Sequence, residues 1–96
     1  THYGEEYGFV PFKDDIKTNL YKIDEPAIKA ILEFNSKEFY DLCKYRTICG
    51  MFAITTGIEL ARLLKCTESE KVCFYNSGDV TGNYENSVNY AGITFK

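Results

Sequence analysis

Apolar residues recur at helical spacing through the first part of the chain. Ile16, Leu20 and Ile23 fall at i, i+4 and i+7 behind two acidic residues, which predicts a short helix that starts near residue 14. A second helix is expected next, because Asp24 precedes a first turn that holds Pro26, where the missing N–H does no harm. Its apolar face consists of Ile28, Ile31 and Leu32.

The same periodicity continues to the middle of the chain. Residues 35–38, Asn-Ser-Lys-Glu, have the form of a capping box, which predicts that the helix breaks there and restarts with Phe39, Leu42 and Cys43 facing inward. Residues 49–66 then predict a central core helix with polar residues on its outer face. Its inward stripe is expected to be Met51, Ile54, Ile58 and Ala61, widened by Phe52, Leu60, Leu63 and Leu64.

The two ends of the chain follow this pattern less clearly. Residues 1–13 carry aromatic and apolar side chains around two glycines and a proline, which is typical of an extended arm. Near the C-terminus, residues 71–76 favour a short strand and residues 81–91 a closing helix with Thr81 as its N-cap. A β-hairpin with its turn at residues 77–78 is the alternative.

These elements predict one domain over residues 1–96, of mainly α class: a small disulfide-stapled helical bundle with an extended aromatic N-terminal arm. Apolar residues make up 45% and aromatic residues 16%, a globular composition. A chain of 96 residues hides a modest share of its surface on folding, so covalent staples would help it. A small α+β fold with a terminal hairpin is the alternative.

The charge pattern argues against two classes of partner. The net charge is −3 and no run of basic residues exceeds two, so no nucleic-acid partner is expected. The longest stretch free of charge, around residues 48–58, is well short of the roughly 20 apolar residues that cross a bilayer, so no membrane partner is expected.

Four cysteines in so short a chain indicate disulfides and an oxidising compartment, so a periplasmic or secreted location is predicted. Cys49 and Cys66, at the two ends of one helix, would lie about 25 Å apart, far beyond the reach of a disulfide. The favoured pairing is Cys43 to Cys49 with Cys66 to Cys73, and Cys43 to Cys66 with Cys49 to Cys73 stays open. The chain begins with Thr1, which suits an exported mature chain or a trimmed one.

The cysteines fit other chemistry less well. Their spacing, C-x5-C-x16-C-x6-C, lacks the tight knuckles of structural zinc sites. A nucleophilic cysteine needs a base, and the only histidine is His2, in the N-terminal arm. No catalytic residue, metal or cofactor is therefore expected, and the protein is predicted not to be an enzyme. Two pairs of acids, Asp14 with Asp15 and Glu68 with Glu70, keep a carboxylate hydrolase as a minor alternative.

Four short motifs follow one another between residues 36 and 93. They are Leu42-Cys43, Cys49-Gly50 with Gly57, Cys73-Phe74, and Val80-Thr81 followed by Tyr84 and Val88. In this order they resemble the periplasmic immunity proteins that protect bacteria from type VI secretion peptidoglycan-amidase effectors. Two features depart from that family: the proline that often follows its aromatic-cysteine pair is missing, and the N-terminal third has no counterpart.

The resemblance implies a non-enzymatic inhibitor that is exported, folds around its disulfides and blocks the groove of a cell-wall amidase. Such proteins commonly bind through loops and often as homodimers, so the implied partners are an amidase effector and a second copy of the chain. A bridge from Cys66 to Cys73 would hold one such loop rigid and lower the cost of ordering it. The implied partner-binding residues are Glu68, Ser69, Glu70, Tyr75, Asn76 and Asp79.

A second function fits the same composition. A small secreted pathogen effector or toxin would bind a host protein through its aromatic surface, with the N-terminal arm and a β tail forming a mixed sheet. Helix content measured by circular dichroism separates the two, since helix well above half of the residues favours the immunity protein.

Overall fold

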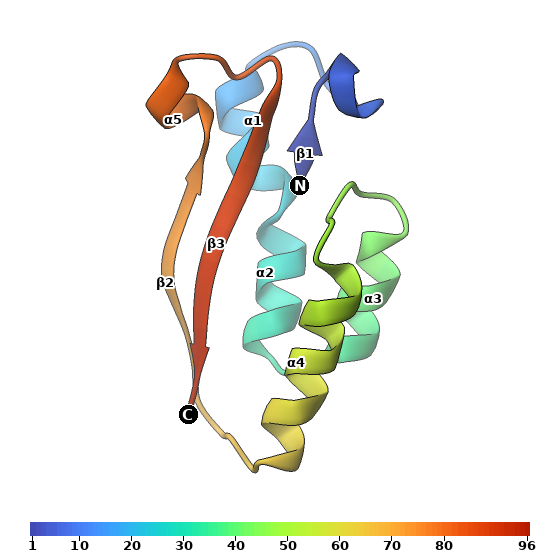
Figure 1. The fold of residues 1–96 in the computed structure, drawn as a ribbon, viewed down its shortest axis with the longest axis vertical. Coiled ribbons are helices and arrows are strands. Elements are labelled where there is room, and N and C mark those ends of the chain that lie inside the picture. The colour runs from blue at the N-terminus through green and yellow to red at the C-terminus, as the bar shows by residue number, and fades with distance from the viewer.

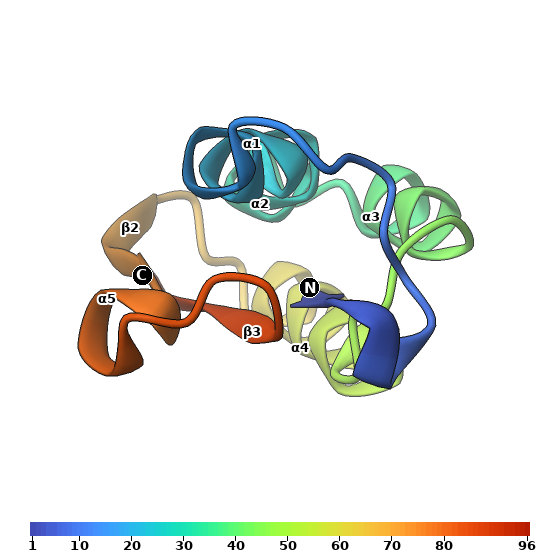
Figure 2. The ribbon, with the colours of Figure 1, turned by 90° about the horizontal axis from the view of Figure 1, so that it is seen from above.

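The computed structural model describes all 96 residues, with helices on one side and a sheet flanked by further helices on the other (Figures 1 and 2). In chain order the elements are β1 (His2–Tyr3), a 3-10 turn (Glu5–Tyr7), α1 (Ile16–Ile23), α2 (Glu25–Leu32), α3 (Ser36–Cys43), α4 (Met51–Leu63), β2 (Ser69–Asn76), α5 (Gly78–Thr81) and β3 (Ser87–Phe95). Figure 2 shows α1, α2 and α3 in one layer, facing the strands and α4.

The four longer helices form where the apolar periodicity predicts them. Asp24 separates α1 from α2 and stays near helical geometry, so the two helices follow each other closely. Phe34 has a φ of 57°, in the left-handed region, so the helical path ends after α2. Asn35 then caps α3 by accepting a hydrogen bond from Glu38 N at 3.1 Å, as the capping box predicts. None of these helices is long and apolar enough to cross a membrane.

The predicted mainly helical bundle is wrong, because the two chain ends build a sheet. β3 pairs antiparallel with β2 on one side and with β1 on the other, in the order β1-β3-β2. The N-terminal arm thus contributes a strand, and residues 87–95 form a strand instead of a closing helix. The architecture is α+β, which the sequence supports only as an alternative.

The predicted disulfide framework is also wrong, since all four cysteines are free. Cys43 is buried in the core with Phe39 and Ile58, while Cys49 is exposed in the loop before α4. Burial raises the pKa of the Cys43 thiol, so this side chain behaves as a small apolar group. Without bridges, the argument for an oxidising compartment no longer holds, and the periplasmic or secreted location stays an untested prediction.

The core lies between α2, α3 and α4. It contains Ala27, Ala30, Ile31, Phe39, Cys43 and Ile58. α4 buries only Ile58 and Ala61 fully. The apolar side chains expected to widen its inward stripe are exposed by 54% to 78%: Phe52, Leu60, Leu63 and Leu64. One long face of α4 therefore has no covering element in this chain.

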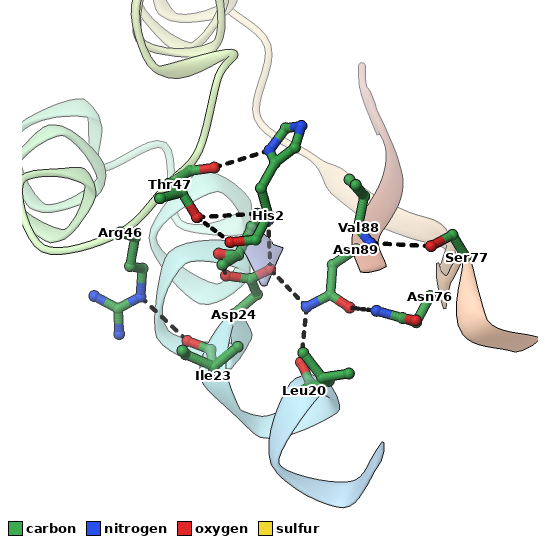
Figure 3. Close-up of polar contacts among 11 residues, drawn as sticks. His2, Leu20, Ile23, Asp24, Arg46, Thr47, Asn76, Ser77, Val88 and Asn89 are labelled. Atoms are coloured by element: carbon green, nitrogen blue, oxygen red, sulfur yellow. Dashed lines mark hydrogen bonds and ion pairs between the residues drawn. The ribbon is translucent and has the colours of Figure 1, made fainter. Parts of the chain in front are cut away.

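A buried polar network joins the sheet to the helices (Figure 3). Asn89 on β3 donates through Nδ2 to Leu20 O at 2.7 Å and to the Asp24 carboxylate at 2.9 Å. Its Oδ1 accepts from Asn76 Nδ2 at 2.8 Å, and Asn76 Oδ1 accepts from Gly78 N at 2.7 Å. This network fixes β2 and β3 over the junction between α1 and α2.

Candidate functional site

Strand β1 is fastened to the loop that leads into α4. The backbone N–H of His2 is shared between O and Oγ1 of Thr47, both at 3.1 Å. The Thr47 hydroxyl donates in turn to His2 O. These contacts join two segments 45 residues apart in the sequence and hold the only histidine beside the loop that carries Cys49 (Figure 3).

The imidazole of His2 is held in one tautomer. Its Nδ1 lies 3.0 Å from Thr47 O. A carbonyl oxygen can only accept, so Nδ1 carries a proton, and in the neutral form of the ring Nε2 keeps a free lone pair. The ring also meets Tyr7 edge-on, with the centroids 4.9 Å apart. In its neutral form, an imidazole whose Nε2 is oriented in this way can bind a metal ion or accept a proton.

Cys49 stands directly before Gly50, the N-cap of α4. Its side chain is exposed, in contrast to that of Cys43. The first turn of a helix has unpaired N–H groups and the positive end of the helix dipole, an environment that favours anions. Of the two cysteines near His2, Cys49 is the accessible thiol, because Cys43 is buried.

His2 and Cys49 line the same open cavity, which has a volume of about 500 Å³. Arg46 closes one side of it and is fixed by donating to Ile23 O at 3.2 Å and to Leu42 O at 3.1 Å. The remaining lining comes from Tyr7, Cys43, Thr47, Ile48 and Met51. The cavity thus joins one imidazole, one exposed thiol, one guanidinium and one phenol on a mostly apolar surface.

His2 and Cys49 are too few to complete a metal site. No group of three or more His, Cys, Asp and Glu side chains lies close enough to hold a metal ion within this chain. Closed zinc sites use four protein ligands and catalytic ones usually three. The pair alone is thus about half of such a site.

The residues expected to bind a partner do not form one surface. Glu68, Ser69 and Glu70 lie at the start of β2, around a polar cavity shared with Thr94 and Lys96. The Ser69 hydroxyl donates to Leu32 O. The other three residues lie at the far end of the strand, and the expected loop between Cys66 and Cys73 is mostly β2.

At that far end, the three predicted residues have different surroundings. Tyr75 is exposed and stacks on Tyr90, with ring centroids 5.3 Å apart. Asn76 is completely buried and belongs to the polar network. Asp79 is exposed and accepts hydrogen bonds from the Tyr21 and Tyr84 hydroxyls and from Asn76 N. Asn76 and Asp79 thus hold the end of the sheet together.

These hydrogen bonds lower the pKa of Asp79 to about 2, with the Tyr21 hydroxyl as the largest cause. A lowered carboxyl pKa stabilises the fold above the unfolded value of 3.8, and this stabilisation is lost as the pH falls from there towards 2. We expect Tyr21→Phe to raise the pKa of Asp79, as measured by NMR titration of its carboxyl carbon. An unchanged midpoint in the variant would exclude the Tyr21 contact as the main cause.

Sequence reasoning does not identify His2 and Cys49 as a pair. His2 lies in the N-terminal arm, far from every cysteine along the chain, and this distance argues against it as a base for any of them. The structure removes that objection through Thr47. The only local signals are a histidine in the aromatic N-terminal arm and a cysteine-glycine pair at a helix start.

Comparison with known proteins changes the interpretation of the whole chain. A family described as Memo-like protein matches residues 1–94. A MEMO1 family protein of Thermococcus kodakarensis is 31% identical over 100 residues, covering 99% of this chain and 34% of its own length. One from Aquifex aeolicus is 40% identical over 76 residues, covering 77% and 28% respectively. No solved structure matches.

The predicted resemblance to immunity proteins is therefore wrong, and so is the inhibitor or effector function built on it. The motifs behind it are pairs of common residues, and the cysteines in three of them form no bridge. The chain spans about a third of the length of the Thermococcus relative.

Proposed function

Since the chain belongs to the Memo-like family, we propose that it supplies one wall of a metal-binding site in a longer protein, with Nε2 of His2 and the thiolate of Cys49 as ligands. The remaining ligands come from the part of a Memo-like protein that this chain does not span. The observation that supports this most directly is the hydrogen bond from Nδ1 of His2 to Thr47 O, which leaves Nε2 free in the cavity that Cys49 lines.

The arrangement around His2 has the features of a metal ligand. Ligating histidines usually donate their other ring N–H to a carboxylate or a backbone carbonyl, which fixes the tautomer and the orientation of the ring. Thr47 O does this here, and Thr47 is itself held by the His2 backbone. The ring is thus oriented before any ion binds, so little ordering is needed on binding.

The donor set indicates which ions fit. Imidazole and thiolate together suit zinc, copper and iron, whereas magnesium and calcium prefer oxygen ligands. No carboxylate lines the cavity, and Arg46 adds a positive charge at its edge. That charge favours a site whose other ligands or bound group are anionic.

Cobalt(II) is the probe for this proposal, because thiolate ligation of Co²⁺ gives a near-ultraviolet charge-transfer band. We expect the reduced 96-residue chain to show this band, and Cys49→Ser to remove it. His2→Ala should weaken Co²⁺ binding at least about tenfold. Cys73→Ser is the matched control, since Cys73 is also exposed but has no histidine beside it, and should leave the band intact.

Two results would contradict the proposal. One is a charge-transfer band that persists in Cys49→Ser. The other is a loss of the band in Cys73→Ser as large as that in Cys49→Ser, which would indicate that exposed thiols bind Co²⁺ without specificity. The expectations of a protein partner and of no catalytic activity stay predictions that this experiment does not address.

A further inference from the structure

An apolar groove lies between β3 and α4. Figures 1 and 2 show α4 on the side of β3 that faces away from β2. The groove borders the His2 cavity, with which it shares Ile48, and has a volume of about 300 Å³. One wall carries Ala91, Ile93 and Phe95 of β3, and the other carries Ile54 and Gly57 of α4. The apolar side chains of α2 form its floor.

One end of the groove is the N-terminus of β1. Thr1 lines the groove, and its carbonyl oxygen accepts a hydrogen bond from Asn89 N at 2.9 Å. β1 pairs with β3 only through His2 with Val88 and Tyr3 with Ser87. Beyond Asn89, β3 continues to Phe95 with β2 as its only neighbouring strand.

The backbone groups on that open edge can be assigned from the ladder. Val88 O accepts from Ser77 N on the β2 side, whereas Asn89 N donates to Thr1 O on the β1 side. Successive residues of a strand alternate between the two sides. The N–H and C=O groups of Ala91, Ile93 and Phe95 therefore point towards the groove, where no strand pairs with them.

We propose that this groove holds a further β-strand, continuous with β1 and formed by the residues immediately ahead of Thr1 in a longer Memo-like chain. The strand runs antiparallel to β3, between β3 and α4. Extending the existing register places the second, fourth and sixth residues ahead of Thr1 opposite Ala91, Ile93 and Phe95. Each of these three pairs exchanges two backbone hydrogen bonds.

Three observations favour this occupant over others. The groove starts where β1 stops, so a strand entering it needs no turn. The Thermococcus relative is about three times as long as the part it shares with this chain, which leaves enough protein to supply a strand. A long apolar sheet edge open to solvent is a hazard that proteins normally cover.

Gly57 is a fourth, independent observation. Glycine inside a helix costs about 0.5–1 kcal/mol relative to alanine, and nothing lies within 4 Å of a Cβ placed there. The missing side chain leaves open space on the groove wall. A neighbouring backbone that approaches α4 closely accounts for glycine at this position.

Amide hydrogen exchange tests the proposal residue by residue. The probe is this chain with an eight-residue N-terminal extension of alternating valine and threonine. We expect exchange at Ala91, Ile93 and Phe95 to slow at least about tenfold, because their N–H groups gain partners. Tyr90, Gly92 and Thr94, which face β2, should change much less and report whether the chain is folded.

Two matched variants of the extended chain sharpen the test. Proline at the second, fourth and sixth positions ahead of Thr1 removes the required donors and should abolish the slowing. Gly57→Leu should raise the helix propensity of α4, but its side chain should fill the groove. This variant should therefore also reduce the slowing of amide exchange.

Three results would overturn the proposal. They are no difference between the two sets of amides, equal slowing with the proline extension, and slowing in the unextended chain that depends on protein concentration. The last would identify a second copy as the occupant.

Discussion

Asn89→Leu should lower the free energy of unfolding by about 3–5 kcal/mol, because three buried groups each lose a hydrogen bond at a cost of about 1–3 kcal/mol. Asn89 is 9% exposed, and its amide serves Asp24, Leu20 and Asn76 together. Leucine fills a similar volume but leaves the Asp24 carboxylate, the Leu20 carbonyl and the Asn76 amide without this partner. Urea unfolding followed by far-ultraviolet circular dichroism measures the loss.

Asn35→Ala is the matched control for this prediction. Asn35 is an exposed asparagine whose side chain caps α3, so its loss should cost about 1 kcal/mol. A destabilisation by Asn89→Leu no larger than that of Asn35→Ala would mean that the buried network does not hold the sheet to the helices.

Gly4→Ala should lower the free energy of unfolding by about 2–4 kcal/mol, because it combines backbone strain with a steric clash. Gly4 has a φ of 130°, a conformation that other residues rarely adopt. A Cβ at this position would stand 2.5 Å from Glu85 O and would also meet the Asn86 side chain. Gly4 directly follows β1, so relief of the clash should displace His2 and weaken Co²⁺ binding as well.

Gly8→Ala separates strain from clash. Gly8 also has a positive φ, of 67°, but nothing lies within 4 Å of a Cβ placed on it, so there is no clash to relieve. Alanine there should cost only about 1–2 kcal/mol and leave Co²⁺ binding unchanged. If both variants have the same small effect in urea unfolding, close packing of β1 on residues 85–86 is not important for stability.

Local patterns are sufficient for the helices. The spacing of Ile16, Leu20 and Ile23, the proline in the first turn of α2 and the cap at Asn35 each depend on neighbours within one or two turns. Each of these features acts independently of the rest of the fold, and α1, α2 and α3 lie where they are expected.

The sheet depends on contacts that no local pattern contains. Tyr84, Val88 and Ala91 fit helical spacing, yet residues 87–95 are a strand because β1 and β2 pair with them from both sides. Alternation and helical periodicity are hard to tell apart over so few residues. The partner strand at the other end of the chain decides the outcome.

The exposure of the α4 face also depends on contacts that no local pattern contains. The pattern of Leu60, Leu63 and Leu64 predicts burial, and within this chain nothing covers them. An apolar helix face of this size is typical of an interface. The Thermococcus relative is about three times as long as the part that it shares with this chain, so a protein of that length has further residues that can cover such a face.

The candidate site could not be predicted from the sequence, because it depends on a contact between residues far apart along the chain. Distance along the chain places His2 far from the cysteines, whereas Thr47 brings it to the loop before Cys49. Counting cysteines favours bridges, and the structure shows four free thiols, of which Cys43 belongs to the core and Cys49 to the cavity.

The imidazole ¹⁵N NMR spectrum of His2 tests the proposed site most directly, and it needs no assignment because the chain has one histidine. We predict that the neutral ring carries its proton on Nδ1 and not on Nε2, and that adding Zn²⁺ shifts the Nε2 resonance, a shift that Cys49→Ser abolishes and Cys73→Ser preserves. A neutral ring with its proton on Nε2, or a Zn²⁺-induced shift that is unchanged in Cys49→Ser, would contradict the proposal that His2 and Cys49 bind one ion together.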